Sequence, residues 1–144
     1  MTRLRNIPGL LALIEQRSAV PFSWSQECDC ASFAALAARA QSGIDARGAL
    51  RWDGVKEAFE VIRAEGGLAM AFDRRFDRVP EAMAQRGDIA AVADRRLQIR
   101  MMVVEGATLV APGKYGLERS PRSAMIIAWD AMSGRTIEQG RADV

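Results

Sequence analysis

Residues 21–40, with the sequence PFSWSQECDCASFAALAARA, decide the fold because an aromatic, extended loop leads there directly into an alanine-rich segment. Between residues 31 and 40 the chain has no proline or glycine, and the large apolar residues Phe33 and Leu36 are three positions apart. Alanine and leucine favour helix, and this spacing places the large side chains on one face. The sequence therefore predicts a tightly packed helix over this segment.

Both ends of this predicted helix carry boundary signals. Asp29 is a good N-cap, and Gly43 is a good C-terminal stop. Cys30 then lies in the first turn, where free backbone N–H groups and the helix dipole favour the thiolate and lower the thiol pKa from about 8.5. The sequence thus places Cys30 where a nucleophile would be placed. The alternative is an inert, buried cysteine, because small apolar cysteines are common in alanine-packed helices.

Several short motifs follow one another in an order that resembles a family of proteins. They are Trp24, Asp29-Cys30-x-x-Phe33-Ala34-Ala35, Arg86-Gly87-Asp88 before a strand, Ala111-Pro112-Gly113-x-x-Gly116-Leu117, and Trp129. In this order they are similar to the motifs of small NlpC-like proteins with the papain-like cysteine peptidase fold. Members of that family are found in phage and prophage tail gene clusters. The resemblance covers about residues 8–129.

The chain departs from the family pattern at the cysteine. In the family, glycine and then Asp-Cys usually follow the tryptophan, whereas here Ser25 follows Trp24 and an extra residue precedes Asp29. Cys28 and Cys30 are therefore both candidates for the nucleophile position. We assign it to Cys30 because Asp29 and Phe33 both keep their spacing to that residue. Cys28 is interpreted as incidental.

A second departure concerns the catalytic base. In active relatives a histidine begins a strand with a His-x-Gly-Ile-x-x-Gly-like pattern, and aligning its last glycine with Gly106 places Arg100 at the histidine position. The chain contains no histidine, so it cannot form a Cys-His dyad by itself. Arginine has a pKa above about 12, so it can stabilise a thiolate but cannot accept its proton or protonate a leaving amine. The resemblance therefore implies a retained fold with lost activity.

Composition restricts the class of protein. The chain has 144 residues, of which 49% are hydrophobic and 26% are charged, which predicts a single domain over 1–144 with a core at about 8–130 and a polar tail at 131–144. The net charge is +2, with no basic block interleaved with aromatic residues, so we expect no nucleic-acid partner. The apolar run at residues 10–14 is too short for a signal or membrane-spanning segment.

The close spacing of the two cysteines leads us to expect no cofactor. Cys28 and Cys30 are too close in sequence for an ordinary structural disulfide and provide only half a metal site. We therefore expect no resident metal. The alternative is a cysteine metal or cluster site that other subunits complete.

The remaining pattern predicts helices first and strands second. Further helices are expected at residues 7–18, at 52–64 with Asp53 as cap, and at 68–76, with a helical turn at 80–84. An irregular link is expected at 44–51. Antiparallel strands are expected at 89–92, 97–104, 108–110 and 124–129. Residues 112–116 are expected to form a long hairpin turn. The alternatives are a lip over the former active-site groove of the family, or an interface loop. This is the α+β layout in which the cysteine-bearing helix packs on the sheet, as in papain-like folds.

Two functions follow as expectations. The first is a structural component of a phage or phage-derived tail, at the tip or baseplate, with tail-tip, hub or baseplate proteins as partners. Such a protein is made in the cytoplasm of the host bacterium and resides in the virion. The alternative is an active peptidoglycan amidase or endopeptidase that uses Cys30 during genome delivery, with Arg100 or a partner's side chain in support.

Overall fold

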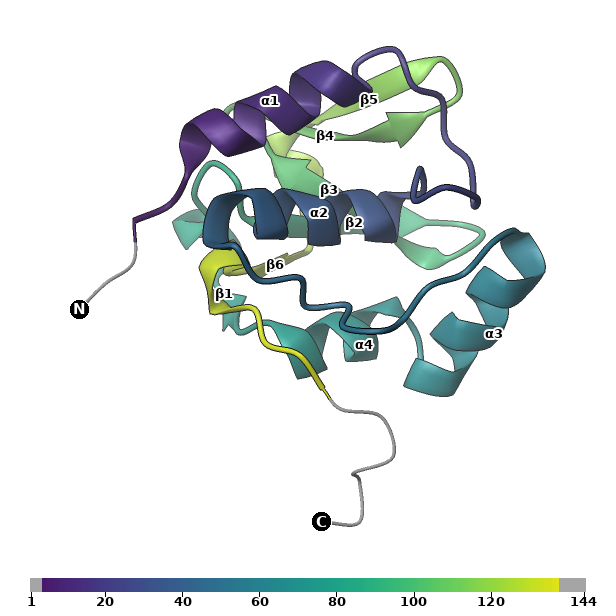
Figure 1. The fold of residues 1–144 in the computed structure, drawn as a ribbon. Coiled ribbons are helices and arrows are strands. Elements are labelled where there is room, and N and C mark those ends of the chain that lie inside the picture. Colours follow the sequence, from purple (N-terminus) through teal and green to yellow (C-terminus); the bar gives the residue numbers. More distant parts are fainter. Residues whose placement is uncertain (1–3, 138–144) are drawn as a thin grey trace.

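The computed structural model describes residues 4–137, in which helices come first and strands second (Figure 1). The four α-helices of this part are α1 (Ile7–Arg17), α2 (Cys30–Ser42), α3 (Val55–Glu65) and α4 (Leu68–Arg75). The strands form one six-stranded antiparallel sheet. The predicted α+β class is therefore confirmed.

Helix α2 lies at the centre of the molecule, beside α1 and against the sheet (Figure 1). Nine of its 13 residues are buried. Its alanines let neighbouring elements approach closely. The crossing with α1 is so tight that a Cβ on Gly9 would lie 2.7 Å from the carbonyl oxygen of Ala40. Both predicted boundaries of α2 are confirmed, since Asp29 is the N-cap and Gly43 ends the helix at a φ of 83°.

Helix α3 begins later than predicted. We expected a start near Trp52 with Asp53 as cap, but the helix starts at Val55 and its N-cap is Gly54, with a φ of 99° and no side-chain capping bond. The N-cap is bonded to the loop before α2, because Gly54 N–H donates to the carbonyl oxygen of Trp24, 3.1 Å away. The helix cannot extend backwards through a residue held in this conformation.

The sheet combines a meander with a returning strand. Its strands are β1 (Arg78–Val79), β2 (Ile89–Asp94), β3 (Gln98–Val104), β4 (Thr108–Gly113), β5 (Gly116–Pro121) and β6 (Ile127–Trp129). The order is β1-β6-β2-β3-β4-β5, so β6 returns to pair between β1 and β2. The predicted turn at 80–84 corresponds to a 3-10 helix, Glu81–Met83, and two further 3-10 helices are Arg122–Ala124 and Ala131–Ser133.

Three strand predictions need correction. β1 and β5 were not predicted, and the strand expected at 124–129 is only Ile127–Trp129 because Arg122–Ala124 forms a 3-10 helix. Strand β4 runs through Pro112 to Gly113, which pairs with Gly116, so the turn between β4 and β5 is much shorter than the long loop expected.

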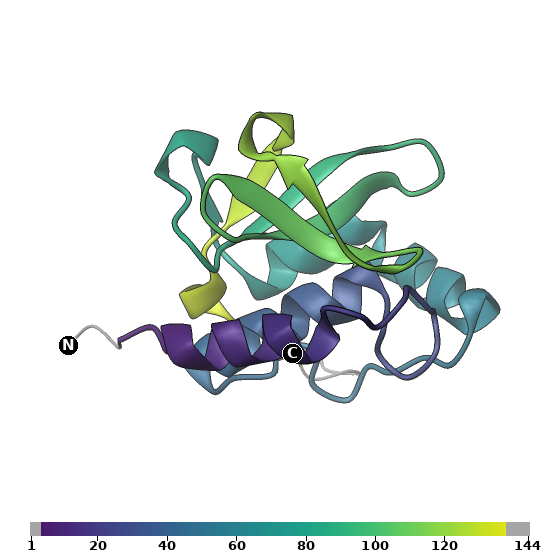
Figure 2. The same ribbon diagram turned by 90° about the horizontal axis from the view of Figure 1, so that it is seen from above.

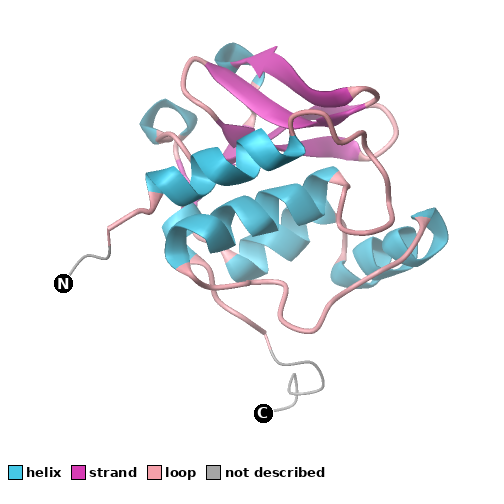
Figure 3. Cartoon of the chain, turned by 45° about the horizontal axis from the view of Figure 1, so that its top comes forward, coloured by secondary structure: helices cyan, strands magenta, loops and turns pink. Residues whose placement is uncertain are grey.

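Alternating residues place the sheet between two apolar clusters. One face packs against α1, α2 and α4 through residues such as Ile89, Met101 and Val103. The other face forms a second cluster, in which Ala90, Met102, Val104 and Leu109 contact Ala84 and Met125. Figures 2 and 3 show the helices gathered on one side of the sheet.

The segment predicted as a polar tail begins inside the fold. Ala131 is fully buried, and its N–H donates to Asp88 Oδ1 at 3.1 Å. Arg135 N–H donates to the carbonyl oxygen of Arg75 at 3.0 Å. Residues 131–135 of the predicted polar tail are therefore bonded to the fold, and residues 138–144 lie outside the described residues.

Candidate functional site

The candidate site is a groove of about 440 Å³ above the N-terminus of α2. Its lining comes from the loop before α2, from α3, and from the two turns that join β2 to β3 and β4 to β5. The lining side chains are Phe22, Trp24, Cys30, Phe59, Asp94, Arg96, Leu97, Arg100, Pro112, Lys114 and Glu118, with the backbone of Gly113. The sequence-predicted residues Cys30 and Arg100 therefore meet at one groove.

Cys30 is the first residue of α2, as predicted, but its thiol is not activated. The residue is fully buried. Burial raises the pKa of Cys30 from 9.0 to about 12; hydrogen bonding with the Met101 backbone and the charge of Arg100 lower it by less, and the charge of Asp29 raises it further. The predicted decrease is therefore wrong, because loss of hydration outweighs the field of the helix terminus.

Arg100, on β3, is already paired. Its Nη2 atom lies 3.1 Å from Glu118 Oε1 on β5 and also donates to the carbonyl oxygen of Pro112. The guanidinium is close enough for its charge to lower the Cys30 pKa, although burial prevails. An arginine in this position provides positive charge and hydrogen-bond donors, and no proton acceptor.

Asp29 has a structural role at the base of the site. One carboxylate oxygen accepts from Ser32 N–H at 2.9 Å, and the other accepts from the Ser32 hydroxyl at 2.8 Å and from Trp52 Nε1 at 3.0 Å. The residue is fully buried, and this burial raises the pKa of Asp29 although the hydrogen bonds oppose the increase. Asp29 is absent from the groove lining, so its contribution is to fix the start of α2.

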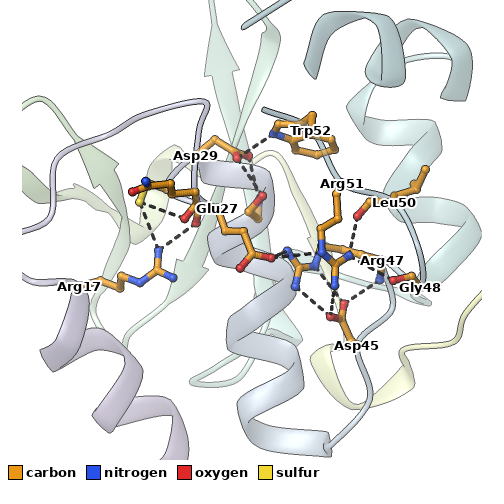
Figure 4. A network of polar contacts seen from close by, with 12 residues as sticks. Arg17, Glu27, Asp29, Asp45, Arg47, Gly48, Leu50, Arg51 and Trp52 are labelled. Carbon is orange, nitrogen blue, oxygen red and sulfur yellow. Dashed lines mark hydrogen bonds and ion pairs between the residues drawn. The ribbon is translucent and has the colours of Figure 1, made fainter. Parts of the chain in front are cut away.

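A polar network that we did not predict holds the loop before Cys30 (Figure 4). Arg47, which is only 9% exposed, pairs with Glu27 and with Asp45, and Arg51 contacts the same two carboxylates. Glu27 has a φ of 62° and the preceding Gln26 has a φ of 58°, values that favour glycine. The charges at residues 45–51 were the available sequence signal, but only the fold brings them to Glu27.

Cys28 lies outside the groove lining. Its thiol contacts the carbonyl oxygen of Gln26 at 3.4 Å, and Arg17 Nη1 lies 4.0 Å from the sulfur (Figure 4). Of the two cysteines, Cys30 is the one that lines the groove and begins the helix. The assignment of the nucleophile position to Cys30 thus agrees with the geometry, while the role itself stays a prediction.

A family model described as "Domain of unknown function (DUF6950)" matches residues 2–131. The chain belongs to this family. The matched part of this DUF6950 chain contains all four helices, all six strands and every residue of the groove lining. A comparison with curated proteins found no match. The NlpC-like resemblance therefore stays a prediction.

Residues 4–137 lack two other kinds of feature. None of the helices in this part is both long and apolar enough to cross a membrane. The same residues contain no group of three or more histidine, cysteine, aspartate or glutamate side chains placed to hold a metal ion. The groove that contains Cys30 and Arg100 is the feature on which the proposed function is based.

Proposed function

We propose that this protein is a non-catalytic structural component of a phage or phage-derived tail, at the tip or baseplate, built on an inactive papain-like fold. The observation that carries the non-catalytic part is the state of Cys30, whose fully buried thiol has a pKa of about 12 in a chain without histidine. The tail location and the papain-like identity rest on the sequence resemblance.

The chemistry of the groove supports a loss of hydrolysis. A thiol with this pKa is thiolate in only about one molecule in 100,000 at pH 7. The cations Arg96, Arg100 and Lys114 cannot remove its proton. Glu118 is bound to Arg100, and a carboxylate is a far weaker base than such a thiolate, so proton transfer to it is strongly uphill.

One observation favours the alternative, an active peptidoglycan amidase or endopeptidase. Cys30 lines an open groove beside Arg100, and the charge of Arg100 acts to lower the thiol pKa. A partner protein that supplied a base next to Cys30 would complete a catalytic pair. This alternative requires that the partner also remove the burial that now raises the pKa.

Digestion of purified muropeptides separates the two functions. The natural protein is compared with Cys30→Ala and with Arg100→His, each alone and together with purified phage tail-tip and hub proteins. We expect no turnover by the natural protein under any of these conditions. Turnover that disappears in Cys30→Ala would overturn the non-catalytic proposal and identify Cys30 as the nucleophile.

The structural role has its own test. We expect the protein to co-elute with tail-tip, hub or baseplate proteins on size exclusion, and to be present in purified particles by mass spectrometry. A protein that stays monomeric with every such partner and is missing from the particle would contradict the tail assignment, whatever the outcome of the digestion.

A further inference from the structure

We propose that the groove above Cys30 binds a segment of a partner protein in which an acidic side chain is adjacent to an aromatic one. The inference rests on the proposed function in one respect, that the groove is a binding site and not a reaction site. It adds the chemistry by which such a partner would be recognised. The argument uses three features of the groove: an aromatic wall, cations without an ion pair, and a fixed rim.

The aromatic wall is made of Phe22, Trp24 and Phe59. The ring centroids of Phe22 and Trp24 are 5.1 Å apart and those of Trp24 and Phe59 are 5.6 Å apart, both in edge-to-face geometry. All three side chains are only half-buried and line the groove. Neighbouring aromatic rings that remain partly exposed at a groove provide a surface against which another aromatic or large apolar side chain can pack.

The charged side of the groove has a positive excess. Arg100 is paired with Glu118, whereas Arg96 and Lys114 form no ion pair with any residue between 4 and 137. Lys114 lies over the Tyr115 ring, 5.4 Å from its centroid. The remaining carboxylate, Asp94, already accepts the backbone N–H groups of its own turn, including that of Arg96 at 3.0 Å. Two exposed cations beside an aromatic wall are complementary to a carboxylate next to an apolar group.

The rim of the groove is held in place before any partner arrives. Phe22 N–H donates to the carbonyl oxygen of Gly113 at 2.7 Å, and Leu117 N–H donates to that of Ser18 at 3.1 Å. These bonds join the aromatic loop to the β4–β5 hairpin that carries Lys114. A preformed groove lowers the entropy cost of binding. Its volume of about 440 Å³ lies within the range typical of ligand sites.

The test uses a blocked hexapeptide, Ac-Ser-Gly-Phe-Glu-Gly-Ser-NH2, titrated into ¹⁵N-labelled protein. The reporter is the indole N–H signal of Trp24, assigned by its loss in Trp24→Phe. Matched peptides replace Phe-Glu with Phe-Gln or with Ala-Glu. We expect saturable shifts of the Trp24 signal with Phe-Glu, and binding about two- to fivefold weaker for either replacement, the size of one partly exposed contact.

Protein variants test the charge. We expect Arg96→Glu with Lys114→Glu to weaken Phe-Glu binding by about tenfold or more. Arg63→Glu is the matched control, because Arg63 is an exposed arginine outside the groove, and it is expected to bind like the natural protein. Equal affinity for Phe-Glu and Phe-Gln, no effect of the double variant, or no shift of the Trp24 signal would each overturn the inference.

The peptide titration and the muropeptide digestion can fail independently of each other. Muropeptides, which are another source of acidic peptide, are titrated in parallel, and tighter binding of muropeptides than of Phe-Glu would overturn the choice of a protein segment. Absent turnover together with absent peptide binding would reject this inference alone. Cys30-dependent turnover would reject the non-catalytic function, whatever the peptides show.

Discussion

The Cys30 thiol is expected to react with iodoacetamide far more slowly in the folded protein than in the unfolded chain. The measurement uses a Cys28→Ala background, in which Cys30 is the remaining thiol. Burial raises the pKa of Cys30 from 9.0 to about 12, so at about pH 8 the thiolate fraction falls from about one in ten to about one in ten thousand. Because the thiolate is the reacting species, we expect a rate about a thousandfold lower than in denaturant.

The assay follows alkylation by mass spectrometry from about pH 7 to pH 10.5, with the same protein in guanidinium chloride as reference. The rate in the folded protein is expected to rise about tenfold per pH unit without levelling. Arg100→Gln is expected to slow the reaction further, because the charge of Arg100 lowers the thiol pKa. A plateau below about pH 9, or a rate within about tenfold of the unfolded chain, would refute the argument that burial controls this thiol.

The same raised pKa couples stability to alkaline pH. Below about pH 9 the thiol is protonated in both folded and unfolded chains, so its contribution to stability is fully present. Between about pH 9 and 12 the unfolded chain loses the proton while the folded chain keeps it, so the free energy of unfolding falls by about 1 kcal/mol per pH unit. Urea denaturation at about pH 8 and pH 10 is expected to show a larger loss for the natural protein than for Cys30→Ala.

Three substitutions test the surroundings of the groove by urea denaturation. Asp29→Ala removes the N-cap and leaves the Trp52 indole without its acceptor, so we expect the free energy of unfolding to fall by about 1–3 kcal/mol. Gln26→Gly is expected to raise it by about 0.5–1 kcal/mol, because the φ of 58° at this residue is accessible to glycine without steric cost. Gly116→Ala is expected to lower it by about 1–3 kcal/mol, because a Cβ there would lie 2.4 Å from the carbonyl oxygen of Ser18.

Each substitution has a matched control in the same chain. Asp53→Ala removes a carboxylate that precedes α3 without capping it, and we expect an effect below about 0.5 kcal/mol. Gln16→Gly, inside α1, is expected to destabilise by about 1 kcal/mol. Ser120→Ala is the control on β5. A cost for Asp53→Ala equal to that of Asp29→Ala, or a loss of stability in Gln26→Gly, would contradict the assigned roles.

Local sequence signals were sufficient to predict both ends of helix α2. An N-cap, an apolar spacing and a terminal glycine all lie within a few residues of the helix, so Asp29 and Gly43 could be identified from sequence. Asp53 looked like a comparable cap. The prediction of Asp53 as the N-cap of α3 was wrong because the conformation of Gly54 is set by a hydrogen bond to Trp24, 30 residues earlier in the chain.

The strands β1 and β5 and the pKa of Cys30 depend on contacts between residues that are distant in sequence. The polar strand β5 carries no continuous apolar pattern, and β1 has only two residues, so both are defined by the strands they pair with. The Cys30 pKa was predicted in the wrong direction for a related reason. The helix terminus is visible in the sequence, whereas the burial of the thiol exists only after β3 and the loop before α2 pack around it.

The returning strand β6 also sets an order of events during synthesis. Among the strands of residues 4–137, β1 pairs only with β6, and β6 is also one neighbour of β2. About 50 residues separate β1 from β6 in the chain. A ribosome that has produced the β2–β5 meander has therefore left β1 without a partner and one edge of β2 open. These backbone groups can pair with another nascent chain until β6 emerges. Ribosome pausing before residue 127 would prolong that interval.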